Sequence, residues 1–179
     1  MASSYAGSGS DAMRELFITG LKNAHAVENQ ALSIMKPQVA RIENYPEVAE
    51  RLRAHIEETN GQIARLDELL EGLGTSNSAL KDTALSMSGG MAALTHSVAG
   101  DEILKNSFAN YAFEHFEIAS YKSLLTLAGD GGFANATAAL QQSLREEESM
   151  AQWIDEALPT ITRRYAQLYA EGGSATAKV

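Results

Sequence analysis

Apolar residues recur every three or four positions along four long stretches of the chain, which is the spacing of one face of an α-helix. In the first stretch Phe17, Leu21, Ala24, Ala31 and Met35 follow this spacing. Glycine and proline residues mark where most of the stretches end. The four predicted helices span residues 11–41, 46–72, 101–128 and 133–158.

Residues 75–100 have a different pattern, with little charge and a Gly89–Gly90 pair in the middle. We interpret this segment as a long crossover containing broken helices, because antiparallel neighbours need only a few connecting residues. Two helical hairpins joined by one long crossover predict an all-α, ferritin-like four-helix bundle. After Pro159, residues 160–170 are predicted to form a short C-terminal helix that packs on the bundle.

The length of 179 residues fits one domain. We predict a flexible leader at residues 1–10, a single helical domain at 11–171 and a flexible tail at 172–179, because both ends are rich in Ser, Gly and Ala.

Composition narrows the classes of function. The chain has 23 acidic and 14 basic residues, a formal net charge of −9, which disfavours nucleic acid and anionic membranes as partners. Cysteine is absent, which excludes disulfides, thiolate zinc sites and cysteine nucleophiles. Neither a signal peptide nor a membrane span is evident, so we expect a cytoplasmic protein.

Several glutamates interrupt the apolar stripes near the middle of the predicted helices. Glu28 lies in the first stripe, Glu58 on the inward side of the second, Glu114 and Glu117 in the third, and Glu147 in the fourth. Thirty residues separate Glu28 from Glu58, and thirty separate Glu117 from Glu147. Equal spacing in two hairpins predicts four carboxylates at one level of the bundle.

Four buried carboxylates repel one another unless they are protonated, paired or bound to metal. The stripes carry no Lys or Arg, so one or two divalent cations are the simplest remedy, and oxygen ligands suit iron or manganese. A glutamate on an amphipathic helix usually faces solvent, but the agreement among four helices favours the interior. His25 and His55 each precede a key glutamate by three residues, so either is a candidate ligand or a hydrogen-bonded core histidine.

Several segments resemble the YciE/YciF-type stress proteins of bacteria, over roughly residues 16–165. They are residues 16–17, 26–28, 55–62, 100–106 and 110–121. The resemblance implies a bundle similar to rubrerythrin and ferritin with a fifth helix, a dinuclear metal site and a homodimer. It also implies Glu28, Glu58, Glu117 and Glu147 as metal ligands, with Glu114 as a fifth.

The sequence departs from ferritin-like sites in one respect. Such sites commonly place a histidine three residues after a bridging glutamate, and here Gly61 and Met150 occupy those positions. One hypothesis is therefore a di-iron oxidase or peroxidase-like protein, in which Glu58 and Glu147 bridge two metal ions that react with peroxide or dioxygen. The alternative is a non-catalytic stress or interaction protein with a weak or vestigial site. Iron storage in a cage is a weaker third hypothesis.

Overall fold

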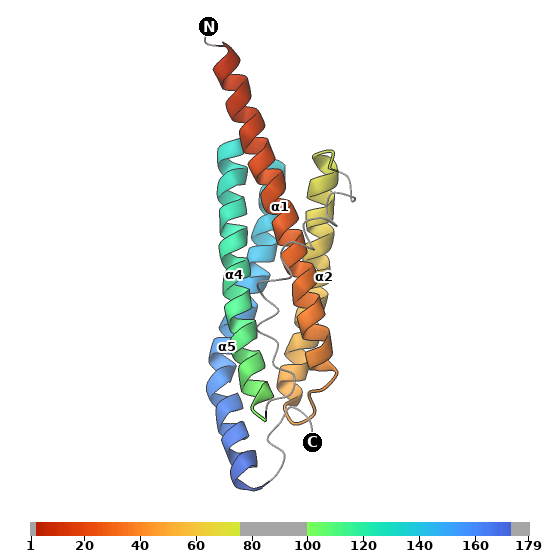
Figure 1. Ribbon diagram of the computed structural model, residues 1–179, viewed down its shortest axis with the longest axis vertical. Coiled ribbons are helices and arrows are strands. Elements are labelled where there is room, and N and C mark those ends of the chain that lie inside the picture. The colour runs from red at the N-terminus through yellow and green to blue at the C-terminus, as the bar shows by residue number, and fades with distance from the viewer. Residues whose placement is uncertain (1–2, 76–99, 173–179) are drawn as a thin grey trace.

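A computed structural model of the chain describes residues 3–75 and 100–172, in two helical hairpins. The first hairpin is α1 (Ser3–Val39) with α2 (Pro46–Gly72), and the second is α4 (Glu102–Gly131) with α5 (Thr137–Ala170), preceded by a short 3-10 helix, η2 (Ala134–Ala136). Neighbouring helices run antiparallel in an elongated bundle, and α1 projects beyond the others at its N-terminal end (Figure 1). The prediction of a ferritin-like four-helix bundle is thus confirmed. The predicted crossover lies almost wholly outside the described residues.

The helices differ from the predicted ones at several ends: α4 continues to Gly131, past the predicted end at residue 128, and α5 begins at Thr137 after a 3-10 turn. α5 continues through Pro159 to Ala170, so the predicted separate C-terminal helix is the last part of α5. Pro159 is exposed, where water can hydrate the carbonyl that loses its amide partner, and Ile161 anchors the following turn in the core. α1 begins at Ser3, within the predicted leader, and runs past Pro37.

The turn between α4 and α5 comes at the end of a glycine-rich stretch, residues 129–132. Gly132 ends α4 in the left-handed conformation, with φ of +73°, which side chains rarely adopt. The next residue, Phe133, stacks on Phe17 of α1 with ring centroids 4.5 Å apart. The turn therefore fixes the second hairpin against the first helix.

A buried polar layer divides the core into two apolar clusters. The cluster toward the N-terminal end of α1 includes Phe17, Leu21, Leu70 and Leu140, and the other is centred on Tyr45, Leu52, Ile103 and Ile154. Between them every helix contributes buried polar side chains: Glu28 from α1, His55, Thr59 and Gln62 from α2, Glu114 and Glu117 from α4, and Ser143 and Glu147 from α5. The predicted level of carboxylates thus lies between two water-excluding regions.

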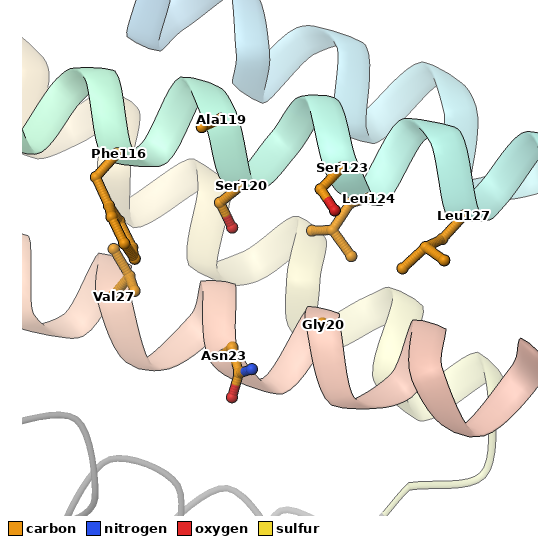
Figure 2. A pocket seen from close by; sticks show the side chains of 9 residues that line it. All are labelled: Gly20, Asn23, Val27, Phe116, Ala119, Ser120, Ser123, Leu124 and Leu127. Atoms are coloured by element: carbon orange, nitrogen blue, oxygen red, sulfur yellow. The ribbon is translucent and has the colours of Figure 1, made fainter.

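The surface between α1 and α4 carries a groove of about 280 Å³. In Figure 2, Phe116 of α4 reaches toward Val27 of α1 at one end of the groove, and Leu127 lies at the other. At Gly20 the two helices approach closely, since an added Cβ would lie 2.8 Å from Leu124 Cδ2.

Among the described helices, none has a stretch both long enough and apolar enough to cross a membrane.

Candidate metal centre

Five ionisable side chains from all four helices meet in the polar layer. They are Glu28 of α1, His55 of α2, Glu114 and Glu117 of α4, and Glu147 of α5, and none is more than 3% exposed. Helical periodicity puts the four glutamates on the inward faces, because each continues an apolar stripe of its own helix. The charges of Glu117, Glu28 and Glu114 all act on Glu147, so the four carboxyl groups form one electrostatic unit.

Three of these residues come close enough to hold one metal ion. His55, Glu114 and Glu147 each offer a ligand atom, and these atoms all lie within 4.8 Å of one another. His55 Nε2 is 3.1 Å from Glu114 Oε2 and 3.5 Å from Glu147 Oε2. An imidazole nitrogen with carboxylate oxygens is a donor set that suits iron or manganese.

Hydrogen bonds from neutral side chains orient two of the carboxylates. Tyr121 donates its hydroxyl proton to Glu28 Oε1, and Gln62 donates its amide proton to Glu147 Oε1. Each carboxylate keeps a second oxygen for another partner. In the part of the chain that the structure describes, the buried side-chain oxygens Glu28 Oε2, Gln62 Oε1 and Glu117 Oε1 accept no hydrogen bond. Glu114 Oε2 and Glu147 Oε2 also lack a well-aligned hydrogen bond, and both lie near Nε2 of His55.

Such unsatisfied oxygens are costly in a protein interior and are the atoms that a hard cation needs. The arginines nearest to the layer do not fill this need. Arg51 pairs with Glu58, and Arg65 pairs with Glu146 and Ser143 at the rim. By this test the residues fit a bound metal.

Glu58 lies outside the carboxylate cluster, contrary to the predicted bridging position. Its side chain is 32% exposed and accepts a hydrogen bond from Arg51 Nη1 at 3.0 Å. It also lies 2.8 Å from Nδ1 of His55, one helical turn away. Glu58 therefore orients His55 from behind, so that Nε2 of His55 points into the cluster.

Burial sets the protonation of the cluster in the metal-free protein. Desolvation raises the pKa of Glu28 to about 8, although the hydrogen bond from Tyr121 acts against it. Desolvation, together with the neighbouring negative charges, also holds the pKa of Glu117 and of Glu147 well above the ordinary value. Without metal, these carboxyl groups retain protons that a free glutamate would have lost.

The pKa values of His55 and Glu58 shift in the directions that favour an ion pair between them. Burial by itself would lower the pKa of His55, but the charge of Glu114 and hydrogen bonding to Glu58 raise it to about 9. Partial burial would raise the pKa of Glu58, but hydrogen bonds from His55 and Arg51 lower it. A protonated His55 thus supplies positive charge to the metal-free site.

Two residues of the site follow less directly from the sequence. For Tyr121 the sequence allows either a hydrogen bond to a core carboxylate or aromatic packing, and favours packing, while Gln62 is only a position on the stripe of its helix. Their hydrogen bonds to Glu28 and Glu147 depend on which helices are neighbours, which periodicity does not reveal. His25, by contrast, lies away from the cluster, with Nε2 3.2 Å from Asp67 Oδ1 on α2.

Comparisons with known sequences identify the family of the chain. Residues 12–167 match a family described as "Domain of unknown function (DUF892)". Protein YciF of Escherichia coli (strain K12) is 31% identical over 145 residues, which cover 76% of this chain and 84% of YciF.

Solved structures with a similar fold include proteins from several bacteria. A protein from Xanthomonas campestris pv. campestris is 30% identical with a TM-score of 0.74, covering 88% of this chain and 99% of that one. The crystal structure of the E. coli stress protein YciF is 25% identical with a TM-score of 0.64, covering 82% of this chain and 94% of that one. A ferritin-like diiron-carboxylate protein from Bacillus anthracis str. Ames is 15% identical with a TM-score of 0.65, covering 82% of this chain and 97% of that one, and supports the fold.

Proposed function

The chain belongs to the DUF892 family, and from that premise we propose that it is a metal-binding stress protein with a dinuclear iron or manganese site. The observation that carries the proposal is the set of buried carboxylate oxygens without hydrogen-bond partners, gathered from the described helices around His55. YciF is described as a stress protein, and we extend that role to this chain. The cytoplasmic location expected from the sequence is part of the same proposal.

Charge favours two ions over one. The cluster contains four carboxyl groups, and two divalent cations balance four ionised carboxylates when His55 is neutral. Glu114, Glu147 and His55 are close enough to share one ion, and Glu28 and Glu117 supply the remaining oxygens. Metal binding therefore requires the carboxyl groups and His55 to release the protons that they hold in the metal-free protein.

Iron or manganese held in the cluster would supply one-electron steps in which the divalent ions are oxidised as peroxide or dioxygen is reduced, and an external electron donor would return the ions to the divalent state; we propose this class of reaction for the protein. The chain's own residues hold and shield the site. Glu58 keeps Nε2 of His55 directed inward, Tyr121 fixes Glu28, and Gln62 fixes Glu147. The two apolar clusters on either side exclude bulk water, which confines reactive oxygen species.

Metal content is the direct test. We expect protein purified from cells supplied with iron and manganese to contain about two ions per chain by elemental analysis. Glu147→Gln removes one ligand and should lower this content by half or more. Glu148→Gln is the matched control, because Glu148 is exposed and pairs with Lys122 at 2.9 Å. Metal-free wild-type protein whose melting temperature does not respond to Mn²⁺ or Fe²⁺ would refute the proposal.

One observation favours the non-catalytic alternative. Met150 stands where ferritin-like sites commonly carry a histidine, and it is 1% exposed within an apolar cluster. Gly61, the corresponding position on α2, has no side chain to offer as a ligand. If the protein binds metal but the loaded form consumes neither peroxide nor dioxygen, the site is structural and the redox part of the proposal is wrong.

A further inference from the structure

A cation that binds in the cluster must first cross a closed protein surface. The cluster residues are at most 3% exposed, and apolar clusters cover the layer from both ends of the bundle. Access must therefore run between two helices, past side chains that give way. This inference rests on the proposed function, because it concerns how metal reaches the proposed metal site.

A crevice between α1 and α4 is lined by one residue of the cluster, Glu114. It holds about 10 Å³, which is room for one water-sized sphere. Its lining residues are Ala31, Ile34 and Met35 of α1 and Asn110, Phe113 and Glu114 of α4. Glu114 is thus both a wall of the crevice and a member of the candidate metal group. We propose that this crevice is the route by which a divalent cation reaches the cluster.

The larger groove between the same helices does not serve this purpose. Its lining residues include Val27, Phe116 and Ser120 but none of the cluster residues (Figure 2). The groove is the larger of the two, but Glu114, a member of the candidate metal group, lines the crevice and not the groove.

Oxygen atoms lie along the approach to Glu114. Asn110 is one helical turn before Glu114 on α4, so the two side chains share a face. Asn110 forms a reciprocal amide pair with Gln38 of α1, donating to Gln38 Oε1 at 2.9 Å and accepting from Gln38 Nε2 at the longer distance of 3.3 Å. This places an amide oxygen at the crevice, and amide and carboxylate oxygens are the groups that can replace water around a cation.

The same polar row continues toward the end of the bundle. Asn106 and Glu102 precede Asn110 at four-residue steps on α4, and both are buried. Glu102 reaches the rim, where it pairs with Arg41. The pair of Asn110 and Gln38 joins α1 to α4, so a structural role alone would account for its hydrogen bonds but not for the opening beside Glu114.

A divalent cation can pass through the crevice only if it loses bound water molecules and the side chains that line the crevice move. A volume for one water-sized sphere is smaller than a hydrated divalent ion. Ile34 is the wall most able to move, because it is half-buried whereas Ala31 and Met35 are buried. The rate of metal uptake should therefore depend on the size of the side chain at position 34, and the final occupancy should not.

The test is the rate of Co²⁺ uptake by metal-free protein, followed by visible absorption in a stopped-flow instrument. Ile34→Ala widens the crevice and should raise the uptake rate about tenfold. Ala31→Val narrows it and should lower the rate by a similar factor. Ile63→Ala is the matched control: Ile63 is half-buried, packs against the same apolar cluster as Ile34, and does not line the crevice.

The outcomes separate the route from the site. Equal stoichiometry in all four proteins, with the expected order of rates, supports the route. Equal stoichiometry with Ile34→Ala no faster than Ile63→Ala overturns the route and leaves the metal site intact. If wild-type protein binds no Co²⁺, Fe²⁺ or Mn²⁺ at all, the proposed function fails and the route fails with it. Thermal melts of each variant check that the fold is retained.

Discussion

A carboxyl group in a protein interior is stable only if it keeps its proton, gains a hydrogen-bonded or charged partner, or binds a cation. In the polar layer of this bundle the first two solutions are incomplete. Tyr121 and Gln62 each satisfy one oxygen of Glu28 and Glu147, and His55 is one cation beside four carboxyl groups. The metal-free protein must therefore hold extra protons, which makes its stability depend on pH.

We predict that the metal-free protein becomes less stable as the pH rises from 5 to 9. The pKa of Glu28 is about 8 when folded and near 4.5 when unfolded, so between these values only the folded chain holds the proton, and raising the pH favours unfolding. The pKa of His55 is raised from 6.5 to about 9, so between these pH values the folded chain keeps a proton on His55 that the unfolded chain has lost. Raising the pH through this range therefore also lowers the free energy of unfolding. Each group contributes a slope of at most about 1.4 kcal/mol per pH unit.

Urea unfolding at a series of pH values measures this slope. Glu28→Gln should make it shallower, and saturating Mn²⁺ should remove most of it, because metal-bound carboxylates are already ionised. An unfolding midpoint that rises between pH 6 and pH 8 in the absence of metal would contradict the assignment.

A neutral isostere in the cluster should stabilise the metal-free fold while weakening metal binding. Glu147→Gln retains an oxygen that can accept from Gln62 and removes a group that must be protonated in order to be buried. We expect a gain of about 1–3 kcal/mol in the free energy of unfolding at pH 7. Glu148→Gln on the exposed side should change it by less than about 0.5 kcal/mol. A destabilised Glu147→Gln protein would show that the carboxylate is well paired without metal.

The glutamates of the cluster could be predicted from sequence, because an acidic residue in the middle of an apolar stripe faces the same way as its apolar neighbours. Glu28, Glu114, Glu117 and Glu147 all lie where the stripes placed them. Glu58 does not, because His55 and Glu58 are about 60° apart around α2, and the rotation of that helix decides which of them faces the cluster. Packing of α2 against its neighbours sets this rotation, and it turns His55 inward.

At the scale of the elements, local stop signals predicted the turns better than the prolines predicted helix ends. α4 ends at Gly131, within the glycine-rich stretch but three residues past the predicted end at residue 128, whereas α1 and α5 run through Pro37 and Pro159. A proline removes one backbone hydrogen bond, and packing of the residues beyond it, such as Ile161, outweighs that loss. Helix ends near a proline therefore depend on tertiary contacts that the local sequence does not contain.

Two glycines at the end of α4 should respond in opposite ways to the same substitution. Gly132→Ala places a Cβ on a residue with φ of +73° and should destabilise the protein by about 1 kcal/mol. Gly129→Ala lies inside the helix with open space around the new Cβ, so it should stabilise by about 0.5–1 kcal/mol. Thermal unfolding of both variants measures the difference. Equal melting temperatures would show that the turn is not held in its left-handed conformation.

At the scale of the whole molecule, charge is distributed unevenly. The chain carries a net charge of −9, yet all the residues that line the groove between α1 and α4 are uncharged. Phe116, at one end of the groove, is 47% exposed, and Leu16, one helical turn before Gly20 on α1, is 57% exposed. Two copies of an acidic chain repel each other least where neither presents charge, and small residues such as Gly20 and Ser120 let helices approach closely.

The homodimer implied by the family resemblance stays a prediction, and this groove is where we expect the second copy to bind. Sedimentation velocity of the full chain should show a dimer at micromolar concentration. Phe116→Ser should shift it toward monomer, because Phe116 forms one end of the groove (Figure 2). Tyr169→Ser is the control, since Tyr169 is 72% exposed on α5, outside the groove. A monomeric wild-type protein, or a dimer that Phe116→Ser leaves unchanged, would show that this face does not join two copies.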